Sequence, residues 1–162
     1  MFAYLMAFAT LHPDAHTDLL SAGGAVIAAV LLASLPAHEL LHAAAFRVAG
    51  VPACEIRFGI ERRTLSPYAH TPATMTARGY RLTLLTPGVI LGILPAAGGL
   101  IAASNLLAAL GMFQLIGATA DAYVLWLMRK LPAGALVRDH TSLLGCELAH
   151  NPGRSAPDMA QT

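Results

Sequence analysis

Residues Arg81 to Arg129 read "RLTLLTPGVILGILPAAGGLIAASNLLAALGMFQLIGATADAYVLWLMR", and this stretch decides the fold class. The 47 residues between its two terminal arginines contain a single charged residue, Asp121. A helix needs about 20 apolar residues to cross the hydrocarbon core of a bilayer, so the stretch is long enough for two crossings and a turn. Turn-forming residues collect between Pro95 and Asn105. We therefore predict two transmembrane helices, at about 80–98 and 104–130.

A third predicted span precedes these two. Between Asp18 and Arg47 the only charged residue is Glu39, in a run of 28 residues rich in Ala, Leu and Val, which predicts a spanning helix at about 20–49. The whole chain is 56% hydrophobic and 12% charged, with a mean hydropathy of +0.61, whereas soluble domains carry roughly 25% charged residues. This composition excludes a soluble domain, and we expect the lipid bilayer, not nucleic acid, as a partner.

The basic residues predict the orientation in the membrane. All ten lysines and arginines fall on one side of a three-span arrangement, either between the first two spans or after the third. Because basic loops stay in the cytoplasm, we predict a multi-pass protein of the cell membrane with a cytoplasmic C-terminus. Residues 1–11 are apolar but too short to cross, and they lack the basic region of a signal peptide, so we expect an interfacial segment.

The remaining segments complete a single predicted domain, residues 1–162. The predicted cytoplasmic segment 51–79 alternates apolar and charged residues over 56–61, which predicts a short strand or hairpin. A second strand is predicted within 141–150, and the small, polar residues 151–162 predict a disordered tail. The fold class is therefore an all-α membrane protein of about three transmembrane helices, with a small cytoplasmic β-hairpin or strand.

The first predicted span contains the sequence "SLPAHELLHAAAF", residues 34–46. His38 and His42 are four residues apart, so on a helix they project from one face and can bind one zinc ion. Glu39 lies beside them and could take a proton from a zinc-activated water. The alternative is a polar cluster that only links helices by hydrogen bonds, but ionisable groups at membrane depth are costly and usually functional. We predict one Zn²⁺ per chain, with Glu39 as the catalytic base.

A third zinc ligand is needed, since catalytic zinc usually takes three protein ligands and one water. Away from the ends of the predicted spans, Asp121 is the only other charged residue. His38 lies nine residues before Arg47 and Asp121 lies eight before Arg129, which places them about 13 Å and 12 Å along helices that run the same way. We predict Asp121 as the third ligand. The alternative is a protonated carboxyl that is hydrogen-bonded between helices.

Other polar residues are weaker candidates. Asp139 and His140 follow the third predicted span by about ten residues and could reach the site only if the loop folds back, and Glu147 and His150 come later still. Three further histidines are expected to be solvated: His12, His16 and His70. The two cysteines have no metal-binding spacing and are interpreted as small core residues: Cys54 and Cys146.

Four segments together carry a resemblance to a known family: "HELLHAAAF", "FGIERR", "RLTLLTPGVILGI" and "GATADAYVLWLMRKLPAGALVRDHTSLLGCEL". Over about residues 36–148 the chain resembles the putative zincin peptidases, a family of small bacterial membrane proteins. More distantly, it is similar to the site-2 proteases, intramembrane zinc metalloproteases that cleave membrane-associated substrates. The resemblance implies that His38 and His42 bind zinc, that Glu39 is the base, and that Asp121 corresponds to an aspartate ligand on a later helix.

These features predict an integral membrane zinc metalloendopeptidase that cleaves a membrane-associated protein or peptide. The strand over residues 55–60 could hold an unwound substrate by strand addition. One alternative is a non-catalytic metal-binding membrane protein with a structural or regulatory role. Another is a metal-transport or metal-sensing protein, but that function requires more polar residues along the spans than this sequence contains.

Overall fold

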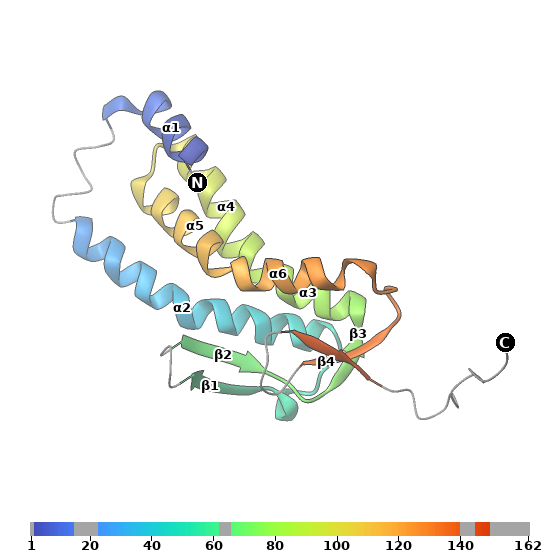
Figure 1. The fold of residues 1–162 in the computed structure, drawn as a ribbon. Coiled ribbons are helices and arrows are strands. Elements are labelled where there is room, and N and C mark those ends of the chain that lie inside the picture. The colour runs from blue at the N-terminus through green and yellow to red at the C-terminus, as the bar shows by residue number, and fades with distance from the viewer. Residues whose placement is uncertain (1, 15–22, 62–65, 140–144, 150–162) are drawn as a thin grey trace, which may run out of the picture.

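A computed structural model describes residues 2–14, 23–61, 66–139 and 145–149 (Figure 1). These residues are mostly helical, and two small antiparallel sheets lie at one end of the helices. The predicted tail at 151–162, together with His16, His140 and His150, lies outside the described residues.

Within the described residues, two helices are long and apolar enough to cross a membrane. The first is α2, Gly23–Val48, which continues through Pro36 and agrees with the predicted span at 20–49. The second runs without interruption from Ala77 to Ala102 and is longer at both ends than the predicted 80–98. It consists of α3 (Ala77–Pro87), the π-helical turn η3 (Gly88–Ile93) and α4 (Leu94–Ala102).

The third predicted span is a bent pair of helices. Helix α5 covers Asn105–Gly117, and α6 covers Thr119–Leu127 and continues as the 3-10 turn η4, Met128–Lys130. The two parts meet at an angle of 43°, so the described residues contain two candidate spans, or three if the bent pair is counted as one. The bent pair covers the predicted span at 104–130, and the helix breaks at Ala118, immediately before the turn that carries Asp121.

The turn between α4 and α5 consists of residues 103–104, so it is shorter than the stretch 95–105 in which turn-forming residues collect. Ala103 adopts a left-handed conformation with φ of 53°, and the Ser104 side chain caps α5 by accepting from the Leu107 amide. Pro95 directly follows the π-helical turn η3 within the continuous helix, and a local change to π-helical geometry is one way in which a helix accommodates a residue that has no N–H. Gly99 lies inside α4, where a Cβ would come within 2.5 Å of the Ala108 backbone nitrogen, so this glycine allows α4 and α5 to touch along their backbones.

Helix α1, Phe2–Leu11, is apolar, too short to span, and packs beside α4 at the end remote from the sheets (Figure 1). The Tyr4 hydroxyl donates to the Ala96 carbonyl at 2.8 Å, and His12 Nε2 lies 2.7 Å from the Leu100 carbonyl. The expectation that His12 is a solvated loop residue was therefore wrong, since its ring is partly buried against α4.

The predicted hairpin is confirmed. After the 3-10 turn η2 (Ala53–Glu55), β1 (Arg57–Glu61) pairs antiparallel with β2 (Ser66–His70). A second sheet has the order β3-β4-β5, all antiparallel, from Thr74–Thr76, Leu136–Asp139 and Cys146–Leu148. Strand β5 falls within the predicted strand at 141–150, whereas β3 and β4 have no counterpart in the sequence prediction.

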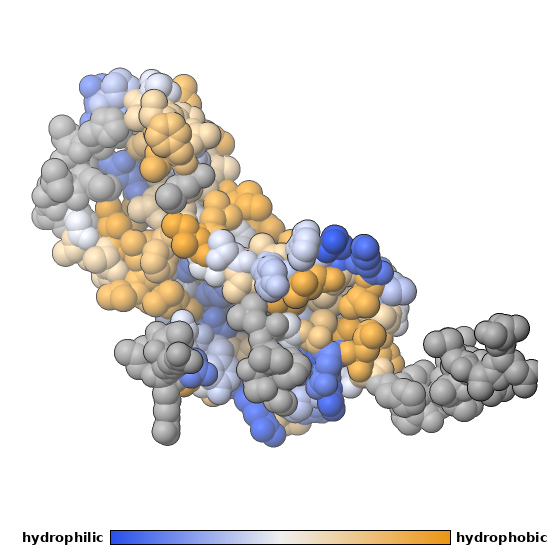
Figure 2. Space-filling model, viewed as in Figure 1, coloured by the Kyte–Doolittle hydropathy of each residue, from blue (hydrophilic) through white to orange (hydrophobic). Residues whose placement is uncertain are grey.

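The hydrophobic core lies where the C-terminal part of α2, α3 and α6 meet the second sheet. Its members are all buried: Phe46, Val51, Met75, Ala77, Tyr80, Leu84, Val124, Met128 and Val137. Away from this core the helices expose large apolar side chains, and Figure 2 shows a hydrophobic surface over them, with hydrophilic residues near the sheets, at the end of α6 and beside α1. An outward apolar surface on long helices is what lipid contact requires.

Candidate metal centre

Helix α2 places the two predicted histidines together. His38 and His42 lie one turn apart, both are at least nine-tenths buried, and their ring centroids are 4.9 Å apart. One ligand atom from each of His38, Glu39 and His42 lies within 4.8 Å of the other two. The His-Glu-x-x-His motif thus forms a compact cluster on a single continuous helix.

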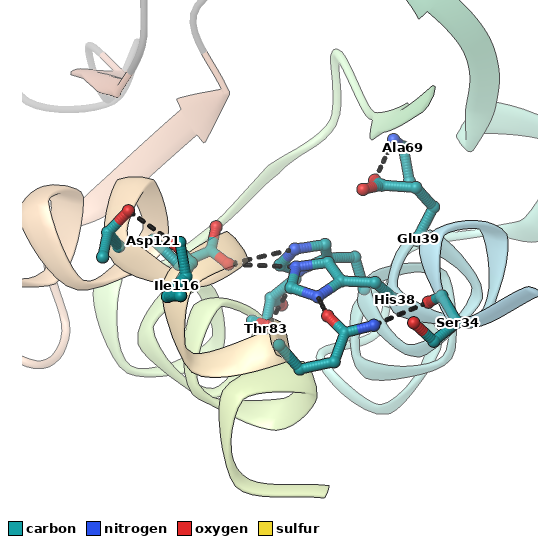
Figure 3. A network of polar contacts seen from close by, with 10 residues as sticks. Ser34, His38, Glu39, Ala69, Thr83, Ile116 and Asp121 are labelled. Atoms are coloured by element: carbon teal, nitrogen blue, oxygen red, sulfur yellow. Dashed lines mark hydrogen bonds and ion pairs between the residues drawn. The ribbon is translucent and has the colours of Figure 1, made fainter. Parts of the chain in front are cut away.

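Asp121 reaches the same point from α6. Its Oδ2 atom lies 3.2 Å from His38 Nε2 and 3.5 Å from His42 Nε2 (Figure 3). The bend at Ala118 makes Asp121 a first-turn residue of α6, where the helix dipole favours a negative charge. Residues separated by about 80 positions in the chain therefore converge on one location between two helices.

The other nitrogen of each imidazole is held by an oxygen atom. His38 Nδ1 lies 3.0 Å from Gln114 Oε1, and the Gln114 amide nitrogen donates to the Ser34 carbonyl at 2.9 Å. This second bond fixes the amide orientation, so Oε1 faces the imidazole and Nδ1 donates to it. His42 Nδ1 lies 3.0 Å from the Thr83 carbonyl, which can only accept. Both rings in their neutral form therefore present the Nε2 lone pair toward Asp121.

The donor set fits a zinc ion. With both rings neutral, two imidazole lone pairs and one carboxylate oxygen converge with no proton donor among them, and a bound cation would stabilise this arrangement. Ligands bound tetrahedrally at 2.0–2.2 Å lie roughly 3.3 Å from one another, and the two contacts of Asp121 are 3.2 and 3.5 Å. Buried imidazole and carboxylate ligands are those that zinc prefers. The ligand role of Asp121 stays a prediction that this geometry favours.

Glu39 is positioned by a strand as well as by its helix. Its Oε2 atom accepts a hydrogen bond of 2.7 Å from the Ala69 amide in β2 (Figure 3). A cavity of about 340 Å³ lies between this strand and the helices, and His38, Glu39, His42 and Asp121 all line it, together with residues 66–69 of β2. The cavity is large enough for water and a short length of peptide.

A second polar cluster lies on the wall of the same cavity. Asp139 Oδ2 lies 2.7 Å from His70 Nδ1, and the Tyr80 hydroxyl donates to Asp139 Oδ1 at 2.8 Å. The segment after the third predicted span does fold back, because β4 pairs with β3 and brings Asp139 to the cavity. The expectation that His70 is solvated was wrong. This cluster joins β2 to the second sheet and to α3.

The remaining candidates lie away from the two histidines. Glu147 forms an exposed ion pair with Arg138 at 2.7 Å. Cys146 is half-buried, and burial, followed by the nearby Asp139 carboxylate, raises the pKa of its thiol, which makes it a poor metal ligand at neutral pH. Cys54 is exposed, so its interpretation as a core residue was wrong.

Gln114 was missed by the sequence analysis, and it carries a testable role. Gln114→Ala is expected to lower zinc affinity about 10- to 100-fold, because the variant leaves the Nδ1 proton of His38 without an acceptor. Competition with a chromophoric chelator measures this affinity. Ser34→Ala is the matched control, since Gln114 uses the backbone oxygen of Ser34, whose hydroxyl bonds within α2. Equal affinities for Gln114→Ala and wild type would contradict the assignment.

Comparison with known proteins places these residues in a family. No curated protein and no solved structure matches the chain. A family model described as "Putative zincin peptidase" matches residues 31–136, well over half of the chain. The match includes the His-Glu-x-x-His motif, Gln114 and Asp121. The chain therefore belongs to the putative zincin peptidase family.

Proposed function

We propose that this protein is an integral membrane zinc metalloendopeptidase that hydrolyses membrane-associated protein substrates, as the site-2 proteases do. The observation that carries the proposal is the convergence of His38 Nε2, His42 Nε2 and Asp121 Oδ2, with the Glu39 carboxylate beside them. Family membership and the His-Glu-x-x-His cluster both support a metallopeptidase.

The proposed mechanism assigns one role to each side chain. Zinc held by His38, His42 and Asp121 would act as a Lewis acid that makes a water acidic and polarises a carbonyl. Glu39 takes the proton of the attacking water and then delivers it to the leaving amine. The Ala69 amide binds one carboxylate oxygen of Glu39, which leaves the other oxygen to face that water.

Substrate delivery is assigned to the edge of β2. Residues 66–69 line the cavity, whereas no residue of β1 does. We therefore propose that the substrate pairs with β2, and not with residues 55–60 as the sequence suggested. An extended peptide beside β2 would lie close to Glu39. A helical substrate must unwind before it can pair in this way, because only an extended chain offers its backbone to a strand.

The proposed location is the cell membrane, with the sheets and the C-terminus in the cytoplasm and the bent α5–α6 pair as a third span. Two long apolar helices support membrane association. Every lysine and arginine lies between residues 47 and 154, either near the end of a candidate span that is closest to the sheets or in the segments 49–76 and 131–154. That distribution matches the positive-inside rule.

Chelation tests the proposal directly. Wild-type protein in lipid vesicles is expected to cleave a membrane-anchored reporter peptide, to lose that activity when a chelator removes the metal, and to regain it when zinc is added back. Gel electrophoresis of the reporter measures cleavage. The alternative function, non-catalytic metal binding, predicts the same zinc uptake with no cleavage of any reporter, and that result would overturn the proposed activity.

A further inference from the structure

A second cavity, of about 550 Å³, lies outside the metal centre, where α2 ends and α3 begins. Its lining shares no residue with the cavity at the metal centre. The wall combines cationic and apolar side chains with small ones: Val48, Ala49, Thr76, Arg78, Gly79, Arg81, Leu82 and Leu85. Because the two longest apolar helices meet here at their ends, the cavity lies at the expected boundary between hydrocarbon and water.

The polar part of the cavity is suited to an anion. The Arg81 guanidinium donates to the carbonyls of Met128 and Leu131 at 2.5 and 2.6 Å, which fixes its charge in the wall. The Arg78 guanidinium is exposed and forms no hydrogen bond or ion pair with any residue that the structure describes. No carboxylate is among the lining residues. The planar guanidinium matches the geometry of a phosphate group.

The apolar part continues from Arg78 along α3. Leu82 and Leu85 follow Arg78 by four and seven residues, so the three share one helix face, and both leucines are about half exposed. Leu85 also lines an adjoining cavity of about 170 Å³, together with Val89 and Ile93, and apart from Asp121 all the residues that line this cavity are apolar. The track from Arg78 to Ile93 is on the order of 20 Å long, which exceeds the roughly 15 Å of one hydrocarbon leaflet.

We propose that this cavity binds an anionic phospholipid, with its phosphodiester beside Arg78 and Arg81 and an acyl chain along Leu82, Leu85 and Val89. The inference rests on the proposed membrane location but not on peptidase activity. Basic pockets between helices at the cytoplasmic interface recognise such headgroups. The apolar side chains Leu82, Leu85 and Val89 favour a phospholipid over a free phosphate ion, because a free phosphate would contact only the arginines.

Lipid retention tests the proposal. The full-length protein is extracted from vesicles of phosphatidylcholine with a minor fraction of phosphatidylglycerol, and its bound lipids are quantified by mass spectrometry. Wild type is expected to enrich phosphatidylglycerol over its vesicle fraction, and Arg78→Gln is expected to lower this enrichment about fivefold. The matched control is Arg57→Gln, which removes an exposed arginine of β1 outside the cavity and should leave the enrichment unchanged.

Each contrary outcome overturns a defined part of the proposal. Equal enrichment in wild type and Arg78→Gln would exclude the cavity as the site. Equal losses in Arg78→Gln and Arg57→Gln would assign the effect to net charge. Displacement of the lipid by added inorganic phosphate would assign the site to a free anion. Thermal unfolding verifies that each variant is folded, and because cleavage is not measured, failure here is separate from failure of the peptidase proposal.

Discussion

Replacing Glu39 with Gln is expected to reduce peptide cleavage about 10²- to 10⁴-fold while zinc content stays at the wild-type level. The substitution removes the base and keeps the shape, because the Gln oxygen can still accept the hydrogen bond from the Ala69 amide. Cleavage of the membrane-anchored reporter and metal analysis of the same purified sample measure the two quantities side by side.

Two other results of the Glu39→Gln experiment would each change the assignment. Cleavage that persists at the wild-type rate would exclude Glu39 as the general base. Loss of zinc would instead make Glu39 a ligand, as the grouping of His38, Glu39 and His42 within 4.8 Å also allows. Because the two readouts move independently, the roles of base and ligand are separated in one experiment.

Replacing Asp121 with Asn is expected to lower zinc affinity more than about 100-fold. This loss is larger than the one expected when a residue that only hydrogen-bonds to a zinc ligand, such as Gln114, is removed. A neutral amide is a much weaker zinc ligand than a carboxylate, although it has nearly the same shape. His38→Ala should lose zinc to a similar or greater extent, since it removes an imidazole ligand. Metal content after exhaustive dialysis, followed by chelator competition, measures both variants.

Asp139→Asn is the matched control for this experiment, because Asp139 lines the same cavity but contacts His70 and Tyr80 and not the two motif histidines. It is expected to keep its zinc. Unchanged zinc in Asp121→Asn would support the alternative of a protonated, hydrogen-bonded carboxyl and would remove Asp121 from the ligand set.

The helices that could span a membrane were predictable because the signal is simple. Long runs without charge can be counted in the sequence, and α2 and the helix over 77–102 follow from that count. The bend at Ala118 was not predictable in this way, because hydropathy reports how apolar a segment is and not whether its axis is straight. The convergence of Asp121 on His38 was predicted from equal depth, and the 3.2 Å contact agrees with it.

The outer partners of the site were not predictable from spacing. Gln114 meets His38 only because α5 is rotated so that this one side chain faces α2, and a rotation about the helix axis is set by packing. Its signal was present nonetheless, since Gln114 is the lone amide side chain between residues 106 and 130. Asp139 and His70 are 69 residues apart, and only the pairing of β3 with β4 brings them together.

The hydrogen bond between Ala69 and Glu39 also bears on how the chain avoids aggregation. A free strand edge is a template for uncontrolled self-association, since it offers donors and acceptors to any other chain. The edge of β2 that does not pair with β1 offers no free N–H at two positions. The Ala69 amide already donates to Glu39. Pro67 faces the same way by strand alternation and has no N–H. The edge therefore offers carbonyl oxygens alone. A peptide can pair with this edge by donating its own N–H groups to these carbonyls. Two copies of the edge cannot form a continuous hydrogen-bonded ladder, because neither copy supplies an N–H donor to the other.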